Sequence, residues 1–350
     1  MSSQPEPTTR PWLAFLAARG ARLEGDRAPD FGEPAAELAA ARDGTILADL
    51  SHNALLAVTG DDATAFLHAQ FTNDVQSLPE GAAQWNGWCS PKGRLLATFL
   101  LVRRPDGYLL MLPAELAAAV SKRLAMFVLR SKVKIADAGE RYVRIGFAGK
   151  SAAVIVARHF GHTPDPLRSV EKDGATCVAL DTERFVLLVS PVDAPRLWDQ
   201  LAENATKAGY DAWEWMSVRA GIPTILAPTQ DAFVPQMANF ELVGGVSFKK
   251  GCYPGQEIVA RTQYRGILKR RMALAHVDVA ARPAPGQSLY GAAFGEQAAG
   301  TLVNVSPSPE GGFDVLAVAQ VESLRAGDLH LDSPQGPALR IVSHPDLEAA

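Results

Sequence analysis

Hydrophobic positions along residues 45–140 alternate between the spacing of strands and the spacing of helices. Apolar runs indicate strands at residues 55–60, 94–103 and 108–112. The last two runs are separated by Pro-Asp-Gly, a turn sequence, and therefore predict a hairpin. Leu116, Val120 and Leu124 recur at every fourth residue, which is the spacing of one helix face. This part of the chain predicts an α+β unit.

Residues 141–209 follow the same order of elements without obvious sequence repetition. The apolar spacing predicts strands at residues 142–147, 176–180 and 184–190, and helices at 151–160 and 195–207. These residues therefore predict a second α+β unit.

The two ends of the chain have other patterns. Residues 1–34 are rich in Pro, Ala, Arg and Glu and predict a frayed arm with one short helix. After residue 268 the helical spacing disappears, and short β-prone runs alternate with Gly and Pro turns. That pattern is typical of a small all-β module, a barrel or a sandwich. The predicted fold class is α+β with a β domain appended.

Composition is that of a folded protein of two or three domains. The chain has 350 residues, 47% hydrophobic and 21% charged, and its 34 Lys+Arg against 38 Asp+Glu give a net charge of −4. This balance provides no general attraction to nucleic acid, so direct nucleic-acid binding is not expected. The longest apolar run, residues 95–102, is far shorter than the ~20 residues of a membrane helix. The N-terminus lacks the apolar core of a secretory signal, so we expect a cytoplasmic protein without membrane contact.

Three cysteines, Cys89, Cys177 and Cys252, lie far apart in the sequence. An odd and sparse set is poor material for a disulfide framework and suits a reducing compartment. An all-thiolate iron–sulfur cluster takes four cysteine ligands, so one copy of this chain is not expected to hold one stably.

The densest unusual stretch is Lys249–Glu257 (KKGCYPGQE), which places two glycines and a proline around Cys252. Glycine allows a positive φ or a close approach of the backbone to a ligand. Neighbouring lysines favour a thiolate over a thiol, as does the start of a helix at residues 256–261. Two interpretations are open on these residues alone: a reactive thiol on a shaped loop, or a buried, inert cysteine. In the first, the loop around Cys252 is shaped by Lys249, Lys250, Gly251, Gly255, Gln256 and Glu257.

Other chemistry has weaker support. The sequence contains no GxSxG, GxxxxGK[ST], GxGxxG or HExxH motif, which removes the strongest hydrolase, nucleotide-binding and metalloprotease signals. His159 and His162 lack the further ligands of a zinc site, so no metal site is predicted. Trp213 and Trp215 either stack on a flat ligand or pack in the core.

The string GGVSFKKGCYPGQEIVARTQYRG, at residues 244–266, resembles the signature of the YgfZ-type folate-binding proteins. Those proteins are relatives of the glycine-cleavage T-protein that support iron–sulfur cluster assembly and repair. Further resemblance, in the family's order, comes from residues 58–75 (VTGDDATAFLHAQFTNDV), 88–103 (WCSPKGRLLATFLLVR), 213–225 (WEWMSVRAGIPTI) and 233–241 (FVPQMANFE).

The resemblance implies a three-domain ring around a central folate-sized hole. An N-terminal arm at residues 1–34 precedes a split α+β folate-binding-like domain, expected at residues 35–140 plus 210–267. An inserted α+β domain is expected at 141–209, and a C-terminal β-barrel at 268–350.

The resemblance also implies site residues. Cys252 is the cysteine needed for the cluster-related role, and Trp213, Asn53, Arg219 and Tyr253 correspond to the folate contacts. Asn53 stands at a position where the family can carry an aromatic residue, and an amide stacks less well than an aromatic ring. Arg219 stands where T-proteins have a carboxylate, and a guanidinium cannot accept a hydrogen bond from a pterin.

Aminomethyltransferases carry an essential acid in the strand after a Gly turn, and that position is occupied here by Ala97. An alanine cannot activate a folate nitrogen, so glycine-cleavage chemistry is not expected.

The leading hypothesis is an accessory factor for iron–sulfur cluster assembly or repair. It would use the Cys252 loop beside a folate-like cavity, with tetrahydrofolate or a derivative as ligand and iron–sulfur enzymes or cluster carriers as transient partners. One alternative is a folate-dependent aminomethyltransferase or other one-carbon transferase. Another is a plain tetrahydrofolate-binding module that acts on a tRNA-modifying pathway through partners.

Overall fold

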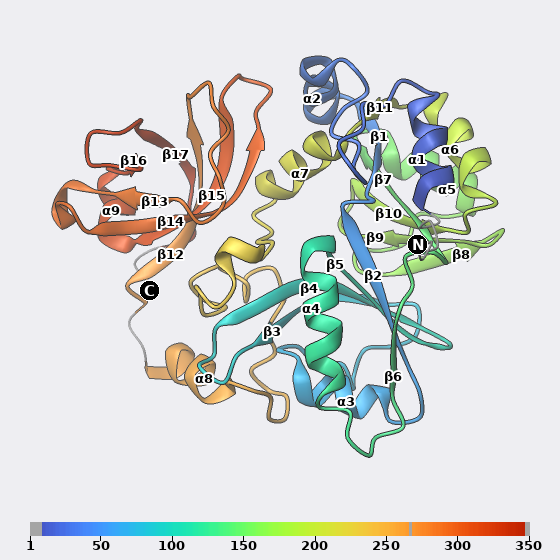
Figure 1. Ribbon diagram of the computed structural model, residues 1–350, viewed down its shortest axis with the longest axis horizontal. Coiled ribbons are helices and arrows are strands. Elements are labelled where there is room, and N and C mark those ends of the chain that lie inside the picture. Colours follow the sequence, from blue (N-terminus) through green and yellow to red (C-terminus); the bar gives the residue numbers. More distant parts are fainter. Residues whose placement is uncertain (1–8, 266–267, 347–350) are drawn as a thin grey trace, which may run out of the picture.

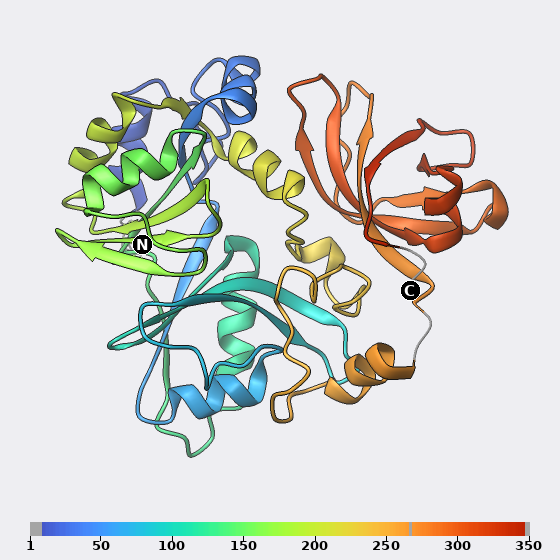
Figure 2. The same cartoon turned by 180° about the vertical axis from the view of Figure 1, so that it is seen from behind.

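The computed structural model describes residues 9–265 and 268–346. Figures 1 and 2 show three groups of elements, each built on one sheet, with a single helix, α7 (Tyr210–Arg219), between them. The predicted α+β class is confirmed.

The first sheet has six strands in the order β11-β1-β7-β10-β9-β8. Their bounds are Thr206–Ala208, Thr45–Asp49, Val143–Gly149, Arg184–Val189, Ala175–Ala179 and Ser169–Lys172. Helices α1 (Thr9–Ala17), α2 (Pro34–Asp43), α5 (Ala152–Phe160) and α6 (Ala194–Ala202) accompany it. The predicted strands and the helix at 151–160 are present.

Two predictions about this unit are wrong. The helix expected at 195–207 ends at Ala202, because the chain then forms β11, which pairs in parallel with β1. The N-terminal arm is not frayed over its described part. Trp12, Leu13 and Leu16 of α1 are buried in the core beneath this sheet.

The second sheet has five strands in the order β3-β4-β5-β2-β6. Their bounds are Ala83–Cys89, Leu95–Arg104, Gly107–Pro113, Asn53–Thr59 and Lys134–Asp137. The predicted hairpin is present, since β4 pairs with β5 up to Arg104 opposite Gly107. Helices α3 (Ala63–Gln70) and α4 (Ala114–Ala125) pack on this sheet, and α8 (Gln256–Arg265) lies at its edge (Figure 1).

The pairing of β1 divides the chain differently from the predicted boundaries. β1 runs antiparallel to β7 and parallel to β11, so residues 45–49 belong to the sheet of residues 143–208. The second sheet is therefore the inserted one, and it interrupts the first between β1 and β7. Local spacing identified the strands correctly, but it contains no information about which distant strand each one joins.

The third sheet is antiparallel, in the order β16-β13-β14-β15-β12-β17. The strands are His330–Leu331, Ser288–Tyr290, Ala298–Pro307, Phe313–Gln320, Arg270–Val277 and Leu339–Ser343. The short helices α9 (Val321–Ala326), η1 (Ala227–Thr229) and η2 (Ala292–Phe294) lie in connections. The sheet curls into a half-barrel, and a bridge between His330 and Ala338 joins its two edge regions. This is the β module that the sequence predicts.

Helix α7 contacts the first and third units. Trp213 packs against β7, and Trp215 Nε1 donates a 2.8 Å hydrogen bond to Asp314 Oδ2 of β15. Helix α7 is therefore held in place by contacts with both the first and the third unit. No helix within the described ranges has the length and apolar character needed to cross a bilayer.

Candidate functional site

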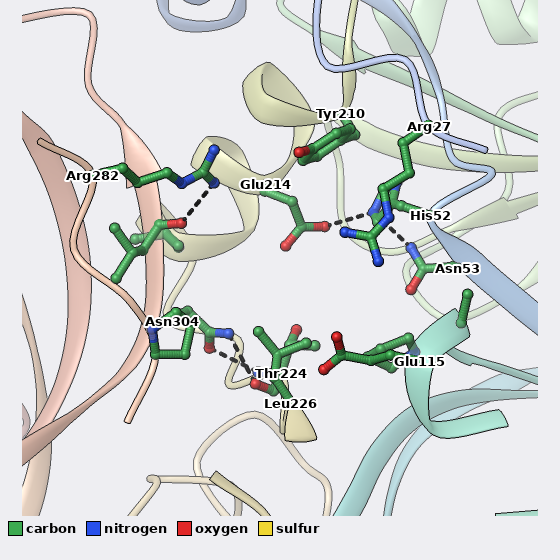
Figure 3. Close-up of a pocket in the computed structure, with 15 residues that line it drawn as sticks. Arg27, His52, Asn53, Glu115, Tyr210, Glu214, Thr224, Leu226, Arg282 and Asn304 are labelled. Atoms are coloured by element: carbon green, nitrogen blue, oxygen red, sulfur yellow. Dashed lines mark hydrogen bonds and ion pairs between the residues drawn. The ribbon is translucent and has the colours of Figure 1, made fainter. Parts of the chain in front are cut away.

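A cavity of about 360 Å³ lies where the three units meet α7 (Figure 3). Its volume falls in the range of small-molecule and cofactor sites. Its polar lining comes from the N-terminal arm, β2, α4, α7 and the third unit: Arg27, His52, Asn53, Glu115, Tyr210, Glu214, Thr224, Arg282 and Asn304. Every unit contributes to the site, so the site exists only in the assembled fold.

His52, Asn53 and Glu214 form a hydrogen-bonded group on one wall. His52 Nε2 lies 3.0 Å from Glu214 Oε1 and 2.9 Å from Asn53 Nδ2. One ring nitrogen cannot donate to the carboxylate and accept from the amide at once, so the proton on Nε2 selects the partner. His52 Nδ1 is buried and has no hydrogen-bond partner among the described residues. The group can therefore rearrange its protons when a polar ligand arrives.

Tyr210 and Arg27 close the side of the cavity next to this group. The rings of Tyr210 and His52 are 5.1 Å apart and tilted by 40°. Burial raises the pKa of the Tyr210 phenol, so its hydroxyl remains a hydrogen-bond donor. Arg27 also lines the cavity, and in the view of Figure 3 its side chain lies on the same side as His52 and Asn53.

Glu37 fixes the arm that carries Arg27. Its Oε1 accepts a hydrogen bond from the Phe31 amide at 2.6 Å, and its Oε2 accepts one from the Gly209 amide at 2.9 Å. Burial raises the pKa of Glu37, and these backbone donors oppose the rise. The arm is thus attached to the turn that begins α7.

The third unit supplies a cation and a reciprocal amide contact. Arg282 Nη1 lies 2.8 Å from Asp211 Oδ1, and its Nη2 donates to the Val305 carbonyl at 3.2 Å. Burial raises the pKa of Asp211, while Arg282 lowers it. Asn304 and Thr224 exchange hydrogen bonds of 2.8 and 2.9 Å, which joins the β14 strand to the segment after α7.

Glu115 supplies a second carboxylate at the start of α4. Its Oε1 accepts a hydrogen bond from the Ala227 amide at 2.7 Å, and its Oε2 has no hydrogen-bond partner among the described residues. The cavity thus presents two carboxylates, Glu115 and Glu214, and two guanidinium groups, Arg27 and Arg282.

These residues fit a folate-like molecule. Carboxylates accept hydrogen bonds from the amino and ring N–H groups of a pterin, and guanidinium groups bind the carboxylates of a glutamate tail. The Tyr210 and His52 rings offer flat surfaces beside them. When bound, such a group would supply a carrier for one-carbon units.

The predicted folate contacts are not all at the cavity. Asn53 lines it, but Trp213 is 3% exposed and packs against Gly146, where an added Cβ would lie 2.5 Å from Trp213 Cε3. Its ring is therefore not free to stack on a ligand here. Arg219 is partly exposed and lies toward Asp314 instead, with Nη1 3.7 Å from Oδ2.

Glu214 is the carboxylate that the sequence analysis missed. The signal was the spacing of Tyr210, Glu214 and Val218, which places them on one face of α7. The two tryptophans considered from the sequence, Trp213 and Trp215, lie on other faces of the same helix. Ala97 is completely buried in β4, so the position of the aminomethyltransferase acid contributes no polar group to the cavity.

Cys252 is exposed, on the loop that leads into α8. No residue of this loop, all of which the structure describes, lines the cavity. Beside Cys252, Lys250 is turned inward, and its Nζ donates hydrogen bonds to the carbonyls of His68 and Phe71 at the end of α3. Burial lowers the pKa of Lys250 to about 8, and the charge of Cys252 acts to raise it. Lys249 is exposed.

The other residues of the loop are held by local contacts. Tyr253 is buried, with Lys250 Nζ 4.9 Å from its ring centre, and burial raises the pKa of its phenol. Gln256 begins α8, and its backbone N–H donates a 3.1 Å hydrogen bond to the Tyr253 carbonyl.

The remaining cysteines are buried. Burial raises the pKa of Cys89 to about 12 and also raises the pKa of Cys177. Within residues 9–265 and 268–346 no group of three or more His, Cys, Asp or Glu side chains is arranged to hold a metal ion.

The fold is that of the T-protein class. A family model described as the GCVT N-terminal domain matches residues 22–243, and the chain belongs to this family. Over 95% of its length the chain superposes on 96% of the glycine cleavage system aminomethyltransferase T from Bartonella henselae, with a TM-score of 0.79 and 17% identity. That likeness establishes the fold.

Within the family, the chain is similar to proteins named tRNA-modifying protein YgfZ. It is 33% identical to those of Cronobacter sakazakii and Escherichia coli over 259 residues. The match covers 73% of this chain and 78% and 79% of these relatives.

Proposed function

We propose that this protein is an accessory factor for iron–sulfur proteins that uses Cys252 as its reactive thiol and a folate in the central cavity. The affected pathway is tRNA modification, as the name of its YgfZ relatives suggests.

The observation that carries the proposal is the contrast among the three cysteines. Cys252 is exposed on a loop whose neighbour, Lys250, is fixed by two carbonyls of the α3 end. Cys89 and Cys177 are buried. A thiol that serves another molecule has to be accessible and held in place.

The thiol step is ligand exchange. Cys252 loses its proton to solvent, and its sulfur replaces one thiolate ligand on an iron of the cluster being transferred or repaired. The displaced thiolate takes up a proton, and the reverse exchange releases Cys252. One sulfur cannot hold a cluster, so the partner protein or a small thiol supplies the other ligands.

The cavity supports tetrahydrofolate as the ligand. Glu214 and Glu115 would accept from the pterin, Arg27 and Arg282 would bind its carboxylates, and Tyr210 would donate from its hydroxyl. Cys252 and the residues of its loop do not line the cavity, so folate binding and thiol chemistry can be separated by mutation.

Complementation tests the proposal. The chain is expressed in an Escherichia coli strain that lacks YgfZ, and tRNA modification and an iron–sulfur dehydratase activity are measured. We expect the wild type to restore both and Cys252→Ser to restore neither, while Cys177→Ser, at a buried thiol, serves as the control. Full rescue by Cys252→Ser would remove the thiol from the function. Turnover of a methylamine donor by the purified protein would favour the one-carbon transferase instead.

A further inference from the structure

A groove runs along the outer side of α3, away from the central cavity. It has a volume of about 990 Å³ and lies between α3 and the segment that follows α4. Its lining residues are Asp62, Ala65, Phe66, Ala69, Gln70, Phe127, Leu129, Arg130 and Ser131. Figure 1 shows α3 and the loop between α4 and β6 side by side at the lower end of the molecule.

One side of the groove carries exposed apolar side chains. Phe127 and Leu129, which line it, are 44% and 88% exposed, and the neighbouring Met126 is 68% exposed. On the opposite side, Ala65 and Ala69 are exposed one helical turn apart. Small residues at this spacing permit close approach of another helix. Exposed apolar groups gathered along a groove mark an interaction site.

The backbone at Leu129 supports this interpretation. Leu129 has φ of +46°, a region that disfavours leucine, although its side chain is almost fully exposed. A turn with Asn or Gly at this position would form more easily. The fold alone gives no reason for a leucine here.

The chain segment that borders the groove after α4 is basic. Residues 122–134 contain five Lys or Arg and no acidic residue, in a chain with a net charge of −4. The two carboxylates across the groove have partners within the protein. Asp61 forms an ion pair with Lys132 at 3.2 Å, and Asp62 accepts a hydrogen bond from the backbone amide of Lys132. Arg130, which lines the groove, forms no ion pair within the described residues. An occupant should therefore carry negative charge beside its apolar face.

The groove ends beside the Cys252 loop. Lys250 Nζ donates to the carbonyls of His68 and Phe71, which flank Ala69 and Gln70 in sequence. Gln70 Oε1 is buried without a hydrogen-bond partner among the described residues, and it can accept from an N–H group of an occupant.

We propose that this groove binds an acidic amphipathic helix of the protein that Cys252 serves. The inference rests on the proposed function and adds the partner's recognition element to it. A helix fits a channel with small residues along one side and large apolar residues along the other, and acidic residues on its flanks fit Arg130 and the other cations of residues 122–134. Binding there brings the partner's body close to the thiol.

Direct binding is the first test. The full-length protein is titrated into a labelled synthetic helix of about four turns, with Leu at i, i+3, i+4 and i+7 and Glu on the flanks. A scrambled peptide of the same composition, vesicles containing phosphatidylglycerol and bulk tRNA are the comparison ligands. We expect binding to the amphipathic peptide and weaker binding to the scrambled one. Preference for vesicles or tRNA, or no binding to any ligand, overturns the proposal.

Variants separate docking from folding. Leu129→Asn suits the local backbone and should leave folding intact while weakening peptide binding roughly tenfold, as expected for an interface anchor. Arg130→Glu should weaken peptide binding and make the affinity less sensitive to salt. Val154→Glu is the matched control, because Val154 is 64% exposed on α5 in a different unit. Equal effects of Leu129→Asn and Val154→Glu would contradict the proposal.

Complementation distinguishes this inference from the proposed function. If Cys252→Ser fails and Leu129→Asn rescues fully at low expression, the docking inference is wrong and the thiol function stands. If Cys252→Ser rescues fully, the proposed function fails and the groove proposal fails with it. If neither Cys252→Ser nor Leu129→Asn rescues, the result supports the thiol function and the docking groove together.

Discussion

Gly93 and Gly255, on two loops far apart in the sequence, lie in direct contact. A Cβ added to Gly255 would lie 2.5 Å from the Gly93 Cα and 2.4 Å from the Ser90 carbonyl oxygen. Gly255 also has φ of +79°. The turn before β4 and the Cys252 loop therefore form one packed unit, which only glycine allows.

Gly255→Ala should destabilise this unit, because it adds both a steric overlap and an unfavourable backbone conformation. We expect a loss of about 2 kcal/mol or more in the free energy of unfolding, measured by urea denaturation. Gly244→Ala separates the two causes. Gly244 has φ of +75° with no heavy atom within 4 Å of an added Cβ, so it should lose only about 1 kcal/mol. Equal losses in both variants would show that the contact with Gly93 contributes nothing.

Thiol labelling should identify a single reactive cysteine in the folded protein. Cys252 is exposed, whereas Cys89 and Cys177 are buried with raised pKa values. A thiol reagent followed by mass spectrometry should therefore label Cys252 alone, and all three in denaturant. Cys252→Ser should abolish labelling of the folded chain. Rapid labelling of Cys89 without denaturant would contradict the burial described above.

The contribution of Lys250 to stability should depend on pH. Burial lowers its pKa from 10.5 to about 8, so between these values the unfolded chain binds a proton that the folded chain does not. The stability of the wild type relative to Lys250→Met should therefore rise with pH in this window, and the contribution is lost as the pH falls through about 8. Its size is on the order of 2 kcal/mol.

Urea denaturation at several pH values checks this prediction. Lys249→Met is the matched control, since Lys249 is the exposed neighbour and should give a difference from wild type that is flat over the same window. A flat or falling difference for Lys250→Met would mean that its ammonium is not buried.

The sequence predicted the elements better than it predicted their partners. The apolar spacing of α4 and the turn residues of the β4–β5 hairpin are local, and both elements were found. β1 joins β7 and β11, an association between distant segments that local spacing does not encode, so the domain boundaries differed.

The same limit applies to the site. Cys252 was identified because glycines and lysines surround it in sequence. Trp213 was placed at the ligand because of the family resemblance, but Gly146 leaves room for its ring against β7. Glu214 shares one face of α7 with Tyr210, but its contact with His52, which is distant in the sequence, follows only from the fold.

Glu214→Gln should weaken tetrahydrofolate binding roughly tenfold or more, since the charged acceptor for the pterin's N–H groups becomes a neutral amide. The same change replaces a carboxylate oxygen with an amide at the contact between Glu214 Oε1 and His52 Nε2, which are 3.0 Å apart. Fluorescence titration under anaerobic conditions measures the dissociation constant. Arg219→Ala is the matched control, because Arg219 lies on the same helix but does not line the cavity. If Arg219→Ala weakens binding as much as Glu214→Gln does, the ligand does not occupy the cavity between the three units.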